Sequence, residues 1–353
     1  MISVETLKRV TVIYTHSHCP DGLASAMILK DAFRMLGMNP RIEFLTHGTP
    51  EHFEAGAPIA NDASMVLFCD IAPHRGGRVR SSSQVIVLDN HVAAKDIVES
   101  FGSLGVYADA EKEPGVSGAV LAHREVWMSI AQQIAKGWIP RELDDFAYCV
   151  GARDTWQTQD PRFLRGQWIS KMLMSKPAAW WLDESGHGTT MHHAPYLSAN
   201  EIEMGRALFE AHEEAVRQAV EQCVMTVVAS QVPPPPLTGR ITPYVLYVFQ
   251  EQAVGFRLCS DVSEALRGKQ KIPGVVAGFS YVVDKPGASP RLLYSLRGLN
   301  DFDVQKFATA NGGGGHKAAA GFSVSLDGVL ARVTPYELVR ALLEMFLGGK
   351  ETP

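Results

Sequence analysis

One short turn constrains the fold of this chain more than any other stretch: residues 16–22, which read His-Ser-His-Cys-Pro-Asp-Gly. The apolar run Val10–Thr15 precedes the turn and predicts a strand. The segment Ala24–Leu36, which is typical of a helix and is closed by Gly37, follows it. In open α/β sheets, ligands bind at the turns that leave the carboxyl ends of parallel strands. A turn of this kind, filled with imidazole, thiol and carboxylate groups, therefore predicts a ligand site on a parallel sheet.

Three further apolar runs predict strands of the same sheet: Ile42–Thr46, Met65–Asp70 and Val85–Asp89. The runs are continuous rather than alternating, which is typical of strands that helices cover on both faces. We therefore expect an α/β fold with a Rossmann-like parallel sheet. Three of the four runs end in groups that bind metals, at His16, at Asp70 and at Asp89-Asn90-His91. Parallel neighbours bring such ends together along one edge of a sheet.

The length of 353 residues predicts two domains, because single cores rarely exceed about 250–300 residues. Helical spacing covers 118–136 and 143–150, and a charged turn, Gly151–Trp156, is expected next. The segment 180–196 has no clear period, and its His-rich part, His187–His193, is either a lid or a surface loop.

Ser198 and Glu201 have the spacing of a capping box and predict the start of a long helix that joins the two domains. The β-like run Val224–Ala229 and four prolines, 233–236, follow this helix. We expect a metal-binding domain over 1–190, a linker and connecting helix over 191–223, and a substrate-binding domain over 224–353. The predicted elements of the last domain are strands at 244–249, 275–283, 292–296 and 321–326, and helices at 262–266, 304–309 and 335–346.

Net charge, cysteine content and the lengths of the apolar runs argue against some classes of function. The net charge of −5 argues against stable binding of long duplex DNA, but it allows a short nucleotide held by a few local cations. Five dispersed cysteines indicate reduced thiols and a cytoplasmic location. No apolar run reaches the length of about 18 residues that a membrane span needs, and no secretion signal is expected. The oligomeric state stays open, with a homodimer as one alternative.

The first predicted domain contains the groups that a divalent-metal site needs. Two metals about 3.5–4 Å apart can activate a water and stabilise the oxygens of a phosphoryl group, and they require carboxylates and neutral imidazoles. Such groups occur here at strand ends and turns: His16, His18, Asp21, Asp70, Asp89, His91 and Asp154. Together they favour a metal site.

Taken singly, most of these residues also have a structural interpretation. Asp21 is placed to cap the helix that follows it. Asp89 and His91 are also typical of hydrogen-bonded loop residues, and Asp154 can pair with Arg153. His18 is typical of a turn residue or an outer partner of a ligand, which leaves its role beside His16 open.

The loop Asn311–His316, with four consecutive glycines, favours a phosphate site. Its ordinary interpretation is a flexible loop. However, a predicted helix precedes it and a strand follows, and bare amides in such a turn can surround a phosphate. Arg297 and His316 would add charge or hydrogen bonds to that phosphate.

At these motifs the sequence resembles the DHH phosphoesterases with an attached DHHA1 domain, of the oligoribonuclease or nucleotide phosphodiesterase type. The resemblance spans nearly the whole chain and depends on five motifs: His16 with Cys19-Pro20-Asp21-Gly22, the strand ending in Asp70, Asp89-Asn90-His91, Asp154 in Arg-Asp-Thr-Trp, and Gly312–His316 followed by Ala319-Ala320-Gly321, with Ser295-Leu296-Arg297 upstream.

The resemblance implies a domain that holds one or two Mn²⁺ or Mg²⁺ ions and a smaller α/β domain with a mixed sheet that binds substrate phosphate and base. By position it implies metal ligands at His16, Asp21, Asp70, Asp89 and Asp154, with Asp70 bridging. It implies catalytic roles for Asp70, Asp89 and His91. The substrate-binding positions that it implies are Arg297, Gly313, Gly314, Gly315 and His316.

Two positions depart from the family pattern. Asn90 stands where the name-giving triplet usually has a histidine, and Cys19 stands where many members have an aspartate. An amide oxygen and a thiol are weaker ligands for hard divalent ions, so we expect these two changes to weaken the binding of the second metal. Cys19, Asn90 and His18 are therefore additional candidate ligands.

These features predict a metal-dependent phosphodiesterase that hydrolyses short oligonucleotides or dinucleotides to mononucleotides. One alternative is a phosphomonoesterase that acts on a 3′-phosphorylated nucleotide and uses the same metals. The other alternative is a nucleotide-binding protein that has lost catalysis through the changes at Cys19 and Asn90.

Overall fold

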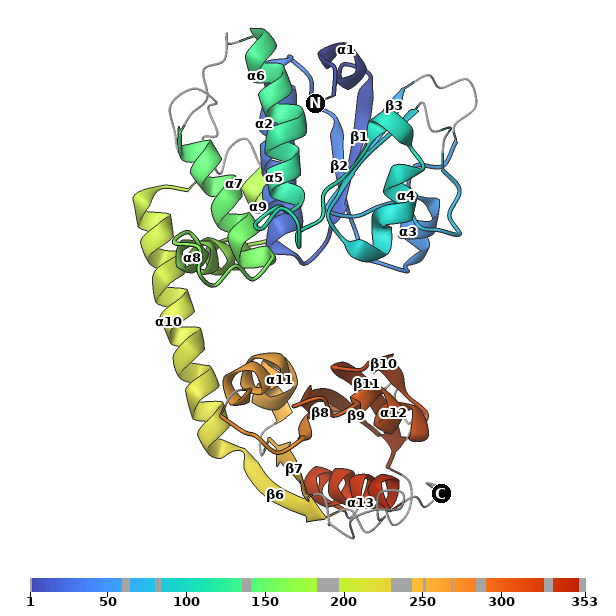
Figure 1. The fold of residues 1–353 in the computed structure, drawn as a ribbon, viewed down its shortest axis with the longest axis vertical. Helices are drawn as coiled ribbons and strands as arrows, with labels where there is room; N and C mark the ends of the chain where they lie inside the picture. Colours follow the sequence, from blue (N-terminus) through green and yellow to red (C-terminus); the bar gives the residue numbers. More distant parts are fainter. Residues whose placement is uncertain are drawn as a thin grey trace. The chain divides into compact units, whose positions relative to one another are not determined.

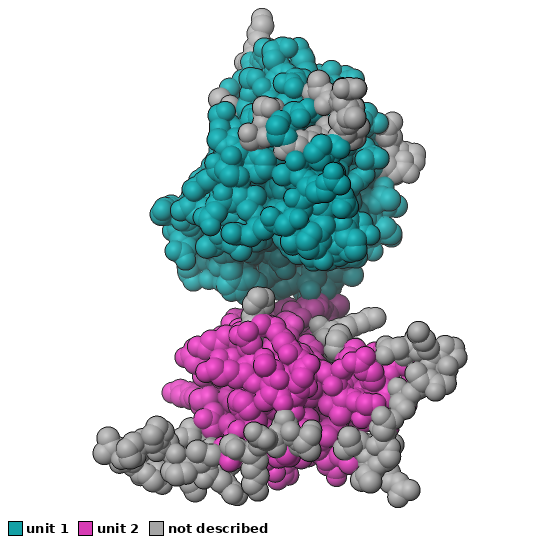
Figure 2. Space-filling view, turned by 90° about the vertical axis from the view of Figure 1, so that its right-hand side faces the viewer, with its two compact units in different colours: residues 1–210 teal, residues 211–353 magenta. Residues whose placement is uncertain are grey.

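The computed structural model describes residues 2–58, 64–79, 81, 84–134, 141–182, 197–229, 243–249, 252–267, 269–283, 290–326 and 333–348. The chain forms two compact units, residues 1–210 and 211–353 (Figure 2). The boundary between them falls within one long helix, α10 (Ala199–Gln222). The predicted domain limits of 1–190, 191–223 and 224–353 stay a prediction.

The first unit is built on a five-stranded sheet in which every neighbouring pair is parallel, with the order β2-β1-β3-β4-β5. The strands are β1 (Val10–His16), β2 (Arg41–Leu45), β3 (Met65–Cys69), β4 (Val85–Asp89) and β5 (Gly105–Tyr107). β3 and β4 are buried along their whole length, as their continuous apolar sequences predict. The α/β fold with a parallel sheet is confirmed.

Helices cover both faces of this sheet (Figure 1). Alternate residues of one strand enter different cores, with Leu67 packed on one side and Phe68 on the other. The larger core packs against α2, α5, α6 and α7, and the smaller one against α4. The helices are α1 (Val4–Leu7), α2 (Pro20–Met35), α3 (Pro50–Glu54), α4 (Lys95–Glu99), α5 (Gly118–Leu121), α6 (Met128–Ile134), α7 (Arg141–Asp154), α8 (Phe163–Met174) and α9 (Ala178–Leu182).

The end of α7 differs from the expected charged turn at Gly151–Trp156. The helix continues through Asp154, and the turn follows at Thr155 and Trp156. Gly151 lies within the helix, and a Cβ at this position would lie 2.2 Å from the carbonyl oxygen of Gly115, so no larger residue fits here. The glycine therefore marks a close approach between α7 and the loop before α5. The segment 180–196 was expected to be irregular, but its first residues belong to the helix α9, which spans residues 178–182. The stretch His187–His193 lies outside the described residues.

The second unit contains a mixed six-stranded sheet with the order β10-β11-β9-β8-β7-β6. β7 and β8 are parallel and the other pairs are antiparallel. The strands are β6 (Val224–Ala229), β7 (Pro243–Val248), β8 (Gly274–Val282), β9 (Arg291–Leu299), β10 (Gly314–His316) and β11 (Ala319–Ser325). α12 (Val304–Ala310) and α13 (Pro335–Leu347) pack on one core, and α11 (Gln252–Leu266) with the end of α10 on the other. The proline run at 233–236 lies outside the described residues.

The long helix begins where its capping box predicts. The Ser198 amide donates to Glu201 Oε2 at 2.7 Å, and the Glu201 amide donates to Ser198 Oγ at 3.3 Å. The apolar stripe of α10 then enters the core of the second unit through Val216 and Ala219. None of the helices that the structure describes is both long and apolar enough to cross a bilayer.

The glycine-rich loop differs from the expectation as well. Gly314–His316 form the edge strand β10, which pairs with β11. The amide of Gly312 donates to Thr309 and that of Gly313 to Ala308, so both close the end of α12 and are not free to surround a phosphate. A tract of glycines has no side-chain pattern from which a strand can be predicted.

Candidate metal centre

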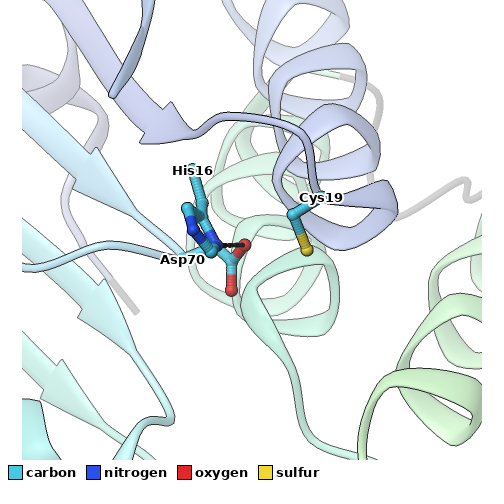
Figure 3. A group of neighbouring side chains, drawn as sticks. All are labelled: His16, Cys19 and Asp70. Carbon is cyan, nitrogen blue, oxygen red and sulfur yellow. Dashed lines mark ion pairs between the residues drawn. The ribbon is translucent and has the colours of Figure 1, made fainter. Parts of the chain in front are cut away.

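The predicted ligands of the first unit gather where the parallel strands end. His16 is the last residue of β1, Asp70 directly follows β3, and Asp89 is the last residue of β4. β1 and β3 are neighbours whose connections leave the sheet in opposite directions, which is where open α/β sheets form their binding crevice. Ligand atoms of His16, Cys19 and Asp70 lie within 4.8 Å of one another (Figure 3). The Nδ1 atom of His16 is 3.8 Å from Oδ2 of Asp70.

The turn after β1 is held against the start of α2 by close backbone packing. The hydroxyl of Thr15 donates to the carbonyl of Gly22 at 2.8 Å. A Cβ at Gly22 would lie 2.2 Å from the carbonyl oxygen of His16, so only glycine permits this approach. Asp70 has a φ of 61°, a left-handed conformation that aspartate tolerates better than most residues. The side chains of the site thus depend on two specific backbone geometries.

Asp21 does not cap its own helix. Cys19 occupies the cap position of α2 without a side-chain hydrogen bond, and Asp21 lies in the first turn. Its Oδ1 atom instead accepts hydrogen bonds from Ser117 Oγ at 2.6 Å and from the Ala119 amide at 3.1 Å. Through Oδ1, Asp21 therefore binds the amino-terminal end of α5. The other carboxylate oxygen of Asp21, Oδ2, takes no part in these hydrogen bonds.

Gly118 makes room for two carboxylates. A Cβ at Gly118 would lie 2.4 Å from Cβ of Asp70 and 2.8 Å from Oδ2 of Asp21. The beginning of α5 thus closes over both side chains, which are 1% and 0% exposed. Two acidic side chains are forced into one buried space.

The Asp89-Asn90-His91 triplet forms a compact turn. Oδ1 of Asp89 accepts from both the amide and the Nδ1 atom of His91, each at 2.8 Å. This bond orients the imidazole and leaves its Nε2 atom facing away from Asp89. The Asn90 side chain is buried, and its Oδ1 atom has no hydrogen-bond partner among the described residues. Asp89 and His91 therefore form a hydrogen-bonded pair of loop residues, as expected from the alternative to a metal-binding role.

The buried acids make the metal-free site electrostatically unfavourable. Burial, followed by the charge of Asp21, raises the pKa of Asp70 well above its ordinary value. The same two causes raise the pKa of Asp154, the last residue of α7, to about 7. No ion pair joins Asp154 to Arg153 within the described residues, although the Arg153 charge counteracts the rise in pKa. A bound cation would remove the cost of keeping these groups ionised.

The surroundings shift the pKa values of His16 and His91 in opposite directions. Burial and the neighbouring His47 lower the pKa of His16 to about 4, so its lone pairs are available at neutral pH. The hydrogen bond that His91 donates to Asp89 raises the pKa of His91. Burial raises the pKa of Cys19 to about 11, which keeps this thiol protonated. His18 is a turn residue with a φ of 54°, and it is His16 rather than His18 that approaches Asp70.

Residues 16–91 also contain a histidine that the sequence interpretation missed. His47 follows β2, and its ring centre lies 4.9 Å from that of His16 and 6.4 Å from that of His91. The signal was present in the sequence: the apolar run Ile42–Thr46 is followed directly by His47, just as other runs are followed by metal-binding groups.

The residues of this edge fit a divalent cation. Four polar atoms of the site are buried without a hydrogen-bond partner in the described part of the chain: Nδ1 of His16, Oδ2 of Asp21, Oδ2 of Asp70 and Oδ1 of Asn90. Buried polar atoms are rarely left unsatisfied unless they serve a function. Three oxygens and one imidazole nitrogen are a donor set that Mn²⁺ and Mg²⁺ accept, with Mn²⁺ better suited to the imidazole.

The predicted substrate-binding residues of the second unit also lie together. The register pairs His316 with Ala319 and Ala319 with Arg297, so the three occupy one row across β10, β11 and β9. Arg297 donates through Nε to Ser260 Oγ at 2.8 Å, and through Nη1 to Ser295 Oγ at 3.1 Å and to the Leu296 carbonyl at 2.9 Å. Its remaining nitrogen, Nη2, makes no hydrogen bond within the described residues and is available to an anion.

Comparison with solved structures identifies the fold. A structure described as the DHH domain of a member of a family of ribosomal proteins matches over 97% of this chain and 87% of that chain, with a TM-score of 0.52 and 12% identity. A pGpG-specific phosphodiesterase, PggH, from Vibrio cholerae matches over 96% and 98%, with a TM-score of 0.48 and 13% identity. Mn²⁺-bound RecJ from Thermus thermophilus matches over 96% of this chain and 52% of RecJ, with a TM-score of 0.45 and 16% identity.

The first of these similarities shows that the chain has the fold of a DHH-domain protein, which confirms the fold that the sequence motifs imply. This chain spans about half the length of the RecJ chain that it matches. No protein-family model and no curated protein sequence matches this chain. The fold is therefore established by structure, and the roles of individual residues are matters for proposal.

Proposed function

We propose that this chain is a metal-dependent phosphodiesterase that hydrolyses short oligonucleotides or dinucleotides to mononucleotides. The observation that carries the proposal is the buried Asp70 carboxylate. It is 1% exposed, faces His16 at 3.8 Å, and has an oxygen without a hydrogen-bond partner in the described residues. A structure retains such an unfavourable group where it serves a function, and a divalent cation satisfies it best.

Asp21, Asp70, Asp89 and Asp154, with His16, are the residues that would hold one or two Mn²⁺ or Mg²⁺ ions. Such ions activate water and neutralise the oxygens of a phosphoryl group during displacement. The protein supplies a rigid donor set: Ser117 and the Ala119 amide fix Asp21, and backbone packing at Gly22 fixes the turn that bears His16. Preorganised charge of this kind supplies much of the rate enhancement in phosphoryl transfer.

His91 is suited to act on the phosphate rather than as a ligand. Asp89 orients the ring through a 2.8 Å hydrogen bond and raises its pKa, so the imidazole holds its proton more firmly. A protonated ring with a free Nε2–H can donate to a phosphate oxygen or to a leaving group. His91 is half exposed, so a substrate can reach it.

In the second unit, Arg297 is proposed to bind a further phosphate of the substrate. Three hydrogen bonds fix its guanidinium, and Nη2 is left available. Gly314, Gly315 and His316 form β10, and His316 lies in the same row of this sheet as Arg297, which supports a phosphate site built on a sheet rather than on a flexible loop. A substrate with a second phosphate or nucleotide has a use for such a site.

The proposal is tested by assaying the full chain with a dinucleotide and with a 3′-phosphorylated adenosine nucleotide, each with Mn²⁺ and with a chelator. We expect mononucleotides from the dinucleotide with Mn²⁺ only. Asp70→Asn should lower turnover by at least about 100-fold, because it removes an anionic ligand needed to hold the divalent cation. Asp96→Asn removes an exposed carboxylate, 3.6 Å from Arg75, and serves as the matched control.

Three other results would contradict the proposal. Release that continues in the chelator excludes a metal-dependent reaction. Turnover of the 3′-phosphorylated nucleotide alone identifies a phosphomonoesterase. Nucleotide binding without turnover under any divalent ion identifies a binding protein whose catalytic function was lost with the changes at Cys19 and Asn90.

A further inference from the structure

A row of aromatic and imidazole rings runs along the strand ends of the first unit. Successive ring centres are 4.9 Å apart for His16 and His47, 5.4 Å for His47 and His52, and 5.2 Å for His52 and His74. His74 lies against Phe53 at 3.7 Å. Hydrogen bonds within the protein explain the positions of only some of these rings.

Two of the histidines have structural roles. His52 is 3% exposed, accepts from the Gly48 amide through Nδ1 at 3.2 Å, and bonds through Nε2 to the Ala72 carbonyl at 2.8 Å. His74 accepts from the Gly76 amide through Nδ1 at 3.0 Å. The bonds of His52 join the turn after β2 to the segment after β3, and the bond of His74 lies within that segment. His52 and His74 thus stabilise the loops.

His47 has no such role. It is exposed, and within the described residues its ring makes no hydrogen bond and no ion pair. The two residues before it are held in place, because the Ser17 amide donates to the Leu45 carbonyl at 2.8 Å and the Ser17 and Thr46 hydroxyls are 2.6 Å apart. The turn after β2 is therefore tied to the turn after β1 and carries an imidazole beside His16.

The geometry points to a further metal ligand: we propose that His47 supplies an imidazole to the divalent cation held at His16 and Asp70. With metal–nitrogen distances of about 2.1 Å, the ring centres of two imidazoles bound side by side to one ion lie about 4.5–5 Å apart. The His16 and His47 centres are 4.9 Å apart, and the ring planes meet at 65°. His47 is not part of the group His16, Cys19 and Asp70, whose ligand atoms lie within 4.8 Å of one another, so it would join the ion by a rotation of its side chain. The unpartnered, buried Oδ2 atom of Asp70 lies 3.8 Å from His16.

This inference rests on the proposed metal-dependent function and adds to it. The triplet of this chain has Asn90 between Asp89 and His91, and therefore one imidazole fewer than the family pattern. The imidazole of His47, in the turn after β2, would replace the nitrogen donor that Asn90 does not supply. It also predicts a preference for Mn²⁺, Co²⁺ or Zn²⁺ over Mg²⁺, because imidazole favours the transition metals.

The test measures metal binding directly in the full chain. Mn²⁺ affinity is measured by electron paramagnetic resonance of the free ion, and Co²⁺ is used to record the ligand-field absorption spectrum. His47→Ala should weaken Mn²⁺ binding by at least about tenfold, and should alter the Co²⁺ spectrum, because a ligand is lost. His47→Asp should recover part of the affinity, since a carboxylate can replace the imidazole.

His74→Ala is the matched control, because it removes an imidazole from the same row of rings that is already hydrogen-bonded to Gly76. Circular dichroism establishes that each variant is folded, and the exposure of His47 makes unfolding an unexpected result. Unchanged Mn²⁺ affinity in His47→Ala would overturn the inference, as would equal losses in His47→Ala and His74→Ala. Both of these outcomes leave the proposed function standing, whereas failure of the unmodified chain to bind any divalent ion would overturn the two together.

Discussion

At the scale of single residues, the site is defined by groups that would be unfavourable in a protein without a function for them. Asp21 and Asp70 are buried together under Gly118, and Asp154 faces the same charges. Ordinary packing avoids unpaired buried carboxylates because each costs several kcal/mol to desolvate, about the net stability of a small domain. The raised pKa values of Asp70 and Asp154 are the electrostatic signature of this arrangement.

This signature predicts how the stability of the metal-free protein depends on pH. Burial and Asp21 raise the pKa of Asp154 from 3.8 to about 7, so between these values the folded state binds the proton more tightly than the unfolded state. The contribution of Asp154 to stability is therefore present at low pH and is lost as the pH rises to about 7. Urea unfolding in a chelator should show stability falling between about pH 4 and about pH 7.

Asp154→Asn should flatten this fall, because the amide does not titrate. Asp160→Asn is the control, since a hydrogen bond from Arg162 lowers the pKa of Asp160 and its linkage has the opposite sign. A slope that is the same in Asp154→Asn and in the unmodified chain would contradict this account of the site.

At the same scale, the sequence predicted which residues lie at the strand ends but not their hydrogen-bond partners, and the roles of these residues stay a prediction. His16, Asp70 and Asp89 were recognisable because each ends a continuous apolar run. That Asp21 would bind Ser117 was not predictable, because the two residues are 96 positions apart and nothing local links them. His47 was missed although it follows a strand in the same way.

At the scale of elements, strands with a buried pattern were predicted well and elements defined by glycine were not. β3 and β4 are entirely apolar before their polar ends, and their bounds lie within one residue of the expectation. β10 consists of Gly314, Gly315 and His316, which have no alternation to detect. The charged turn predicted at Gly151–Trp156 begins later than expected, because α7 continues through Asp154 and Gly151 permits close packing against Gly115.

The β10–β11 hairpin provides a test at this scale with a built-in control. A Cβ at Gly313 would lie 2.1 Å from the carbonyl oxygen of Gly321 and 2.6 Å from Cβ of Phe322, whereas a Cβ at Gly314 would meet nothing within 4 Å. Gly313→Ala should therefore lower the free energy of unfolding by about 1–3 kcal/mol, because the two strands must separate. Gly314→Ala should be close to neutral.

Chemical denaturation of the two variants measures the difference, and nucleotide affinity is recorded in parallel. Gly313→Ala should also weaken nucleotide binding, because β10 carries His316 in register with Arg297 through Ala319. Equal stability of Gly313→Ala and Gly314→Ala would show that the hairpin does not have the geometry described here.

At the scale of the whole molecule, the predicted metal-binding groups and the predicted substrate-binding groups lie in different units, and each unit has its own core. The carboxylates and imidazoles lie in residues 1–210, and Arg297 with the β10–β11 hairpin in residues 211–353. Length and the capping box at Ser198 predict two domains with a helix between them, and the hydrogen bond from the Glu201 amide to Ser198 confirms the start of that helix. The limits 1–190, 191–223 and 224–353 stay a prediction. The net charge of −5 is consistent with a short substrate held by few cations.

The central claim is that a divalent cation binds at Asp70, and anomalous scattering from crystals of the chain grown with Mn²⁺ tests it most directly. The account predicts at least one anomalous peak in contact with Asp70 and His16. A second peak bridged by Asp70 would extend the account to two metals. Intact crystals of the folded protein with no peak beside Asp70 would contradict the claim.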